Sequence, residues 1–411
     1  MRDQKRWMKN WIRALAVGTM ITAAVPISVM AAEKGWVNED GAAHYVDSNG
    51  SYVKNQWKTS QGVSYYLDEN GDLAKNVWVD GTYYAGEDGS MTKDAWIYVD
   101  ENDGSMKSGW YYLNRNGKVE KNDWKTIGKG KYCFDSDGRM RTGWHYENGD
   151  IYYLGNGSEG YTRSGWYFLE SDGKKRPAEG SVSKNLSGES ENGRWYYFQS
   201  NGKARKGENG APKETTIDGK KYYFDENGVM LTGWQCVKEK AEPGDGTGIS
   251  RFVYLGGKED GMLKGQWLET SERPWDTKAW STALNTQAVR KNNTDETALM
   301  KKDGSRWFYL ENDGTPLFLS ADATGLKDGA VKLDGRYYFF DSYGVCQSGM
   351  IKFTSGGKTE TAYFDPEAGG ALSIGRNTNV VDKRDKVYTF CSGTSGSEKG
   401  CGINGVKDGF L

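Results

Sequence analysis

Histidine is nearly absent from this chain of 411 residues, which has only His44 and His145. Neither histidine lies near a nucleophile motif, and a lone histidine is weak evidence for acid–base catalysis. The formal net charge is also small, at −2. A chain without strong positive charge is a poor match for loose electrostatic binding to nucleic acid. We therefore expect no nucleic-acid partner.

Long apolar runs are absent apart from residues 14–30, which follow a basic stretch. Small residues then precede Ala32, so residues 1–31 are predicted to be a cleaved signal peptide rather than a membrane anchor. No other stretch is apolar enough to span a bilayer, and no apolar C-terminal tail indicates covalent sorting to a cell wall. The leader contains five basic residues and one acidic residue, so its removal changes the net charge from −2 to −6.

Cysteine occurs five times, an odd number. Cys133 stands where related segments have a tyrosine, and Cys346 stands where one has Met230; both are predicted to be small hydrophobic core residues. Cys391 and Cys401 are the only close pair. A disulfide between them can form in an exported chain, but their spacing alone does not decide it.

Glycine and aromatic residues are abundant, in contrast to the 7 prolines: there are 56 Gly, 16 Trp and 26 Tyr. The mean hydropathy is −0.79. Disordered chains are equally polar but poor in aromatic residues, so disorder is excluded. This composition indicates a core of flat rings between polar turns.

A repeat organises the chain. Trp36, Trp57 and Trp78 are each 21 residues apart, and a tyrosine pair followed by an Asp/Asn-Gly phrase recurs between such tryptophans. This period is typical of stacked repeats. We predict an all-β fold, a β-hairpin solenoid of about 20-residue aromatic repeats, because one small hairpin cannot bury its apolar face alone.

The hairpin unit is best defined at residues 217–234. Residues 220–224 have strand propensity, 225–228 have turn chemistry, and 229–234 are predicted to return as the second strand. The predicted organisation is a signal peptide (1–31), a repeat solenoid (32–267), an irregular insertion with room for one short helix (268–304), and degenerate repeats with a C-terminal cap (305–411).

The phrase Gly-Trp, Tyr-Tyr-Phe, Asp-x-Asn-Gly resembles the cell-wall-binding repeat family of Gram-positive bacteria. That family includes choline-binding modules, glucan-binding repeats and the repetitive tails of clostridial toxins. In its choline-binding members the resemblance implies an aromatic pocket between consecutive units. One wall is a Gly-Trp tryptophan, the second a tryptophan before the tyrosine pair, and the third a tyrosine of the next unit.

Carried onto this sequence, the resemblance implies ligand-binding rings for choline or sugar. These are Trp57, Tyr66, Trp78, Tyr84, Trp124, Trp144, Tyr153, Trp166, Trp195, Tyr223 and Trp234. Any of them can instead be a stacking residue of the core.

The sequence departs from the choline-binding pattern at the second wall. That position holds Ser64, Thr82, Lys131, Ile151 and Lys221, and we expect a tryptophan there only at Trp195 and Trp307. Two-ring pockets are compatible with sugars, since a pyranose can lie on one exposed ring.

Acidic clusters at residues 100–104 and 135–138 resemble calcium loops only superficially, because they lack the spacing of a calcium-binding loop. They recur as hairpin turns, and we expect no metal site, no cofactor and no catalytic residue. No segment of domain size lies outside the repeats, so no enzyme is predicted.

The predicted function is non-catalytic binding by an exported protein, secreted to the cell wall or cell surface of a Gram-positive bacterium. Its partner is a cell-wall polymer, either choline-bearing teichoic acid or a glycan, held through many weak aromatic sites. One alternative is a surface adhesin that binds host glycans or proteins. Another is a non-catalytic accessory subunit of a wall-modifying system. We expect no membrane span once the signal peptide is removed.

Overall fold

A computed structural model describes residues 34–100, 106–170, 193–283, 297–323, 325–355, 358–381, 387–395 and 399–402. The predicted signal peptide lies outside these residues, as does part of the predicted insertion. Contacts divide the chain into two units. The first runs to Trp124 and includes Cys133–Met140, and the second contains Lys125–Tyr132 and Arg141–Leu411.

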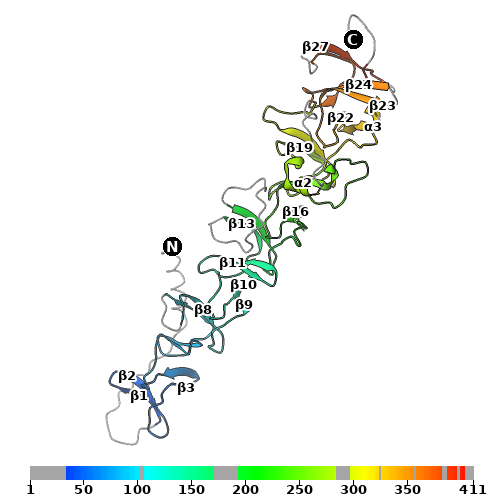
Figure 1. Cartoon of the computed structure of the whole chain (residues 1–411). Helices are drawn as coiled ribbons and strands as arrows, with labels where there is room; N and C mark the ends of the chain where they lie inside the picture. Colours follow the sequence, from blue (N-terminus) through cyan, green and yellow to red (C-terminus); the bar gives the residue numbers. More distant parts are fainter. Residues whose placement is uncertain are drawn as a thin grey trace. The chain divides into compact units, whose positions relative to one another are not determined.

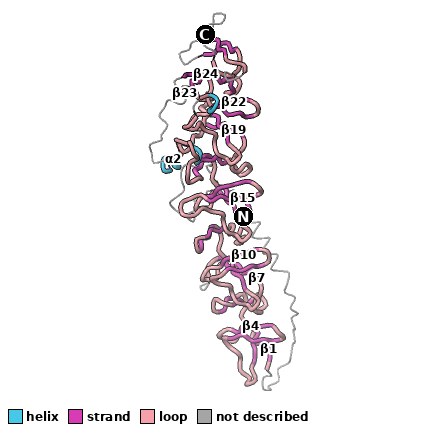
Figure 2. The backbone as a smooth tube through the Cα atoms, turned by 90° about the vertical axis from the view of Figure 1, so that its right-hand side faces the viewer, coloured by secondary structure: helices cyan, strands magenta, loops and turns pink. Residues whose placement is uncertain are grey.

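Small antiparallel hairpins make up the fold. The described residues form twelve two-stranded sheets and one three-stranded sheet, and strands pair with their neighbours along the chain. Among the described residues, helix is limited to short segments of the second unit (Figure 2), including α2 (Lys278–Ala283) and α3 (Leu326–Gly329). The prediction of an all-β fold built from hairpin repeats is confirmed.

The early pairs are β1 (Gly35–Glu39) with β2 (Ala42–Val46), β3 (Gln56–Ser60) with β4 (Val63–Leu67), β5 (Val77–Val79) with β6 (Tyr83–Ala85), β7 (Ala95–Val99) with β8 (Gly109–Leu113), and β9 (Trp124–Ile127) with β10 (Gly130–Cys133). Next come β11 (Trp144–Glu147) with β12 (Asp150–Tyr153), β13 (Gly165–Glu170) with β14 (Gly193–Phe198), β15 (Lys213–Ile217) with β16 (Lys220–Phe224), and β17 (Gly233–Cys236) with β18 (Phe252–Leu255). The last are β19 (Gln266–Thr270) with β20 (Arg306–Leu310), β21 (Ala330–Leu333) with β22 (Arg336–Phe339), β23 (Gly349–Ser355) with β24 (Lys358–Asp365) and β25 (Ala371–Leu372), and β26 (Arg376–Val381) with β27 (Val387–Cys391).

The structure corrects the predicted position of the hairpin turn. The strand at Lys220–Phe224 pairs along its whole length with the preceding strand β15, whereas its pairing with residues 229–234 is limited to a bridge between Phe224 and Met230. The turn between them is Asp218-Gly219, with φ of 49° and 78°. Two successive positive φ values define the tight turn that matches strand twist, and a glycine at the second position adopts it without strain.

The Asp-x-Asn-Gly phrase has a different role, because it returns the chain to the preceding hairpin. The Asp225 carboxylate accepts the backbone N–H groups of Asn227 and Val229, at 2.9 and 2.8 Å. The N–H of Met230 then donates to the carbonyl of Trp195, on the preceding hairpin, at 2.9 Å. The same link joins Cys346 to Trp307 and Met91 to Ser64. Neighbouring hairpins are therefore tied together by a backbone hydrogen bond.

Shared aromatic cores hold consecutive hairpins together. Phe224 is fully buried in a cluster with Ile217, Tyr222 and Met230, and rings of the preceding hairpin pack against that cluster. Cys133 and Cys346 are also buried, as predicted for small core residues. Burial raises the pKa of the Cys346 thiol to about 12.

Two hairpins have long connections between their strands. β13 pairs with β14 across residues 171–192, and β19 pairs with β20 across the predicted insertion. The insertion contains α2, and its Trp280 is buried against Phe252. In Figure 1 the labelled elements of the second unit follow one another in chain order. The residue limits of the four predicted regions stay a prediction.

Candidate functional site

A typical repeat tryptophan contacts two aromatic rings by a simple rule. It packs on the second tyrosine of its own hairpin and on the first ring of the pair in the next hairpin. Trp57, for example, lies 5.3 Å from Tyr66 across its own strands and 5.8 Å from Tyr83 of the next hairpin, measured between ring centroids. The rule places an aromatic cluster where two hairpins meet.

The rule changes which tyrosines come from the neighbouring hairpin. Tyr66, Tyr84 and Tyr153 each pack on the tryptophan of their own hairpin, at 5.3, 5.2 and 5.2 Å. The neighbour's ring on Trp144 is Tyr196, at 4.8 Å. The sequence prediction took the second tyrosine of each pair as the ring that contacts the neighbouring hairpin, but the first ring makes that contact. Alternation along a strand does not show which of its two faces meets the next hairpin.

Tyr223 was predicted to form the third wall of an aromatic pocket, but it packs in a different cluster from Trp166. It is buried with Leu231, Val253 and Leu255, and its hydroxyl donates to the Glu214 carboxylate at 2.7 Å. Burial, with this bond, raises the pKa of the Tyr223 phenol well above its usual value. Its neighbour Tyr222 instead packs on Trp166 at 4.8 Å. Tyr222 is therefore the residue that the sequence prediction missed.

A second tryptophan completes two clusters of three rings. In the Trp166 cluster (Trp166, Trp195 and Tyr222), Trp195 lies 6.3 Å from Trp166 at 86°. The Trp267 cluster (Trp267, Trp307 and Tyr338) repeats this geometry, with 6.3 Å and 78° between the tryptophans. The Trp–Tyr contact is 4.8 Å in both clusters, at 66° and 68°. All six rings except Tyr222 are half-buried.

A third tryptophan pair was missed in the sequence. Trp110 precedes the pair Tyr111-Tyr112, so it also stands at the second wall, and it lies 6.5 Å from Trp96 at 84°. The first strand of this hairpin begins with Ala95 instead of glycine, which hid the Gly-Trp signal. The pairing of Trp96 with Tyr112 reveals the equivalence.

The other predicted rings lie in the core or in clusters that have no second tryptophan among the described contacts. Trp234 is 2% exposed, and its indole N–H donates to the carbonyl of Glu272. Trp78 is also buried, between Tyr84 and Tyr111. Trp57, Trp124 and Trp144 are half-buried. Whether any of these rings binds a ligand stays a prediction.

Asp135, in one acidic turn, and the buried histidine His44 contact the protein backbone. The Asp135 carboxylate accepts the N–H groups of Asp137 and Arg139, which confirms the turn interpretation there; most of residues 100–104 lies outside the described residues. His44 is buried and contacts the carbonyl of Gly71. Burial lowers the pKa of His145. Within the described ranges, no group of three acidic, histidine or cysteine side chains could hold a metal.

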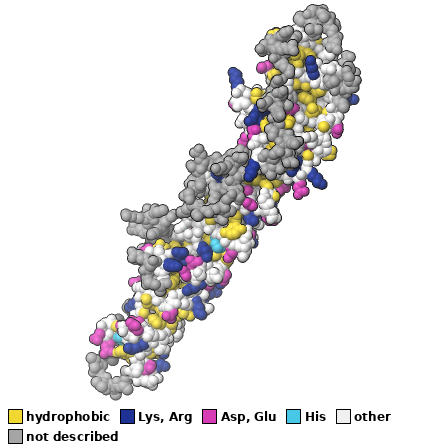
Figure 3. All heavy atoms as spheres, in the orientation of Figure 1, with side chains coloured by type: hydrophobic (Ala, Val, Ile, Leu, Met, Phe, Trp, Pro, Cys, Tyr) yellow, Lys and Arg dark blue, Asp and Glu magenta, His cyan; other side chains and the backbone are white. Residues whose placement is uncertain are grey.

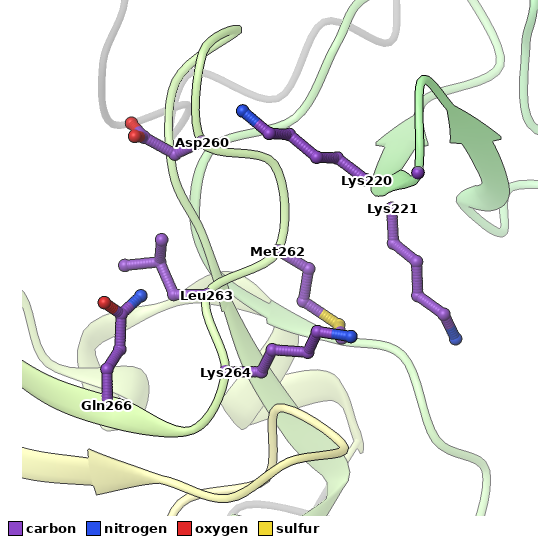
Figure 4. Close-up of a pocket in the computed structure, with 8 residues that line it drawn as sticks. Lys220, Lys221, Asp260, Met262, Leu263, Lys264 and Gln266 are labelled. Atoms are coloured by element: carbon purple, nitrogen blue, oxygen red, sulfur yellow. The ribbon is translucent and has the colours of Figure 1, made fainter.

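A lysine-rich hollow of about 210 Å³ lies beside β16. Lys220, Lys221 and Lys264 line it together with Asp260 (Figure 4). None of the described residues that line it is aromatic. Figure 3 shows that positive and negative side chains are interspersed on the visible surface, so such a basic group is local.

Known repeat families match several stretches of the chain. The choline-binding repeat matches residues 121–166 and 213–242, and the cell wall binding repeat matches 55–73, 107–119 and 189–204. These stretches contain Trp166, Trp195 and Tyr222, which form the Trp166 cluster. These stretches therefore carry choline-binding and cell wall binding repeats. The Trp267 cluster lies outside the matched stretches, yet has the same geometry.

Curated and solved proteins are similar over repeat regions. Glucosyltransferase-S of Streptococcus downei is 27% identical over 138 residues, which is 32% of this chain and 9% of that protein. The same-named protein of Streptococcus mutans serotype c is 26% identical over 178 residues, or 43% of this chain and 9% of that protein. The chain thus matches only a small part of these relatives.

Solved structures of Streptococcus pneumoniae proteins are similar at low identity. Choline binding protein F is 18% identical with a TM-score of 0.41, covering 90% of this chain and 98% of that one. The modular autolysin LytC is 18% identical with a TM-score of 0.41, covering 74% of this chain and 51% of that one.

In the cysteine-rich C-terminal part, Cys391 and Cys401 are both thiols. The Cys401 sulfur lies 3.7 Å from the Glu360 carboxylate. A disulfide between the two cysteines stays a prediction. In the part of the chain that the structure describes, no helix is long and apolar enough to cross a membrane.

Proposed function

We propose that the chain is a non-catalytic binding protein that attaches to choline-bearing cell-wall polymers. The observation that carries this proposal is the repeated three-ring geometry of the Trp166 and Trp267 clusters. A quaternary ammonium has no hydrogen to donate, so it is recognised by ring faces, each contributing roughly 0.5–2 kcal/mol. Three converging rings are the arrangement that such a cation requires.

Several weak sites on one chain suit a repetitive polymer. One cage of this kind supplies roughly −4 kcal/mol, which is about millimolar affinity. Binding at a second cage on the same polymer raises the apparent affinity by roughly 10²–10⁴. This arithmetic favours a polymer over free choline as the partner. We accordingly place the protein outside the cell, on the wall, after cleavage before Ala32.

The absence of catalysis is part of the proposal. Asp225 and Asp135, from the acidic phrases that recur along the chain, are engaged in turns, where their oxygens accept backbone N–H groups. Lysis of purified walls by the purified chain would contradict this part of the proposal.

The decisive experiment removes only the second wall. Trp195→Ser combined with Trp307→Ser leaves the first and third rings in place, and the chain itself carries Ser64 at the equivalent position. We expect the intact chain to be retained on choline resin and eluted by free choline, and the double variant to be lost in the wash. Trp36→Ala, which changes a cluster whose other described rings are the tyrosines Tyr45 and Tyr65, is the control and keeps retention. Equal retention of the double variant would refute the assignment.

Glycan binding is a second candidate, favoured by one observation. Beside Trp57 and Tyr66, the hydroxyls of Thr59 and Ser64 lie 3.0 Å apart, where the Trp166 cluster has Phe168 and Trp195. Hydroxyls next to a half-exposed ring can bind a pyranose. A glycan array probed with the Trp195→Ser, Trp307→Ser variant tests this candidate, because glycan binding survives that change and choline binding does not. Array hits restricted to host glycans would favour an adhesin.

A further inference from the structure

A lysine of the chain itself lies against the Trp166 cluster. The Lys258 ammonium is 5.1 Å from the centroid of the Trp195 ring. Its backbone carbonyl accepts the Tyr222 hydroxyl at 2.6 Å. Lys258 is thus attached to two of the three rings, Trp195 through its charge and Tyr222 through its backbone. Its ammonium also pairs with the Glu259 carboxylate at 2.6 Å.

The Trp267 cluster has the same feature from an unrelated segment. The Lys301 ammonium lies 5.7 Å from the centroid of the Trp307 ring. It pairs with the Glu269 carboxylate at 2.5 Å, and Glu269 is the strand partner of Trp307. Lys258 lies between β18 and β19, and Lys301 lies just before β20, so the two lysines reach equivalent tryptophans from different parts of the sequence. The described residues place no such cation over Trp110.

An ammonium on a ring face makes the same interaction as a quaternary ammonium ligand. Two cations in one ring cluster repel each other. A lysine that belongs to the chain can return to the ring without a bimolecular step, so it competes efficiently with a free ligand. We propose that Lys258 and Lys301 are built-in competitors that occupy the second wall of each cluster until a quaternary ammonium displaces them. This inference rests on the proposed function and adds the residues that set its affinity.

The acidic partners give each displaced lysine a place to go. Glu259 and Glu269 hold the two ammonium groups beside the rings, so displacement requires only a small movement of the lysine side chain along its ion pair. At the Trp267 cluster, Glu269 also remains beside the ring as a counter-charge for the incoming cation. The competitor therefore lowers affinity without closing the site.

The test is a choline titration of the full chain by calorimetry at constant ionic strength. Lys258→Gln removes the charge and keeps the backbone carbonyl that holds Tyr222. We expect the affinity of one class of sites to rise about twofold to thirtyfold, the range set by one cation–π contact. Lys264→Gln, which removes a lysine of the hollow beside β16, leaves the affinity unchanged.

A second substitution tests whether the gain in choline affinity comes from the Trp166 cluster. In a Trp195→Ser background, Lys258→Gln should give no gain, because the ring over which the lysine lies is missing. Unchanged or weaker choline binding by Lys258→Gln overturns this inference. Absence of choline binding by every variant, Lys258→Gln included, overturns the proposed function and this inference together.

Discussion

At the residue scale, the same side chain type has two roles that its hairpin position decides. Trp234 is sealed in the core by Tyr254 and Phe308, whereas Trp195 stands half-buried at the second wall. The sequence predicted that tryptophans and tyrosine pairs cluster where hairpins meet, and Trp166 and Trp195 lie in such a cluster. Their binding of a ligand stays a prediction. The sequence could not choose between Tyr222 and Tyr223, because their side chains leave opposite faces of one strand.

The ion pair between Lys238 and Asp313 gives a prediction about how stability depends on pH. The Asp313 carboxylate accepts the Lys238 ammonium at 2.7 Å and the Thr315 hydroxyl at 2.8 Å. Burial raises the pKa of Asp313, but these hydrogen bonds outweigh it and lower that pKa from 3.8 to about 2. A lowered pKa in the folded state means that Asp313 contributes stability above about pH 4, which is lost as the pH falls toward 2.

Asp313→Asn removes this contribution. We expect urea unfolding midpoints of the variant and the parent chain to differ most at pH 5 and to converge near pH 2. In a Lys238→Met background the difference at pH 5 shrinks, because the partner of the carboxylate is gone. A constant difference across this pH range would contradict the link.

At the element scale, two kinds of turn alternate along the chain and have different roles. Asp218-Gly219 closes a hairpin, whereas residues 225–228 carry the chain to its neighbour. Both contain Asp and Gly, so turn chemistry alone indicated where the chain turns but not which strands pair. The same ambiguity hid the pairing of β13 with β14 across residues 171–192.

Gly219→Ala tests the assignment of the hairpin turn. Gly219 has φ +78°, and no heavy atom lies within 4 Å of an added Cβ, so the effect comes from the backbone alone. We expect a loss of about 1–2 kcal/mol in the free energy of unfolding. Gly246→Ala is the matched control, since Gly246 is exposed, equally free of neighbours and outside the left-handed region. Equal stability of the two variants would show that the turn has been misplaced.

At the scale of the whole molecule, binding sites and stability come from the same junctions. The cluster around Phe224 contains residues of one hairpin and receives Trp166, Trp195 and Tyr197 of the hairpin before it. In repeat proteins stability is a sum of such neighbour terms, so no hairpin is expected to fold or bind alone. The repeat period and composition predicted this organisation, because a polar chain rich in rings has no other way to bury them.

We propose that junctions between hairpins hold a quaternary ammonium between three rings. The most direct measurement is a crystal structure of the chain with choline. We predict choline density between Trp166, Trp195 and Tyr222, with a second site at the Trp267 cluster and the Lys258 ammonium moved away from Trp195. Choline bound elsewhere, or ring clusters that stay closed by protein atoms at saturating choline, would contradict the account.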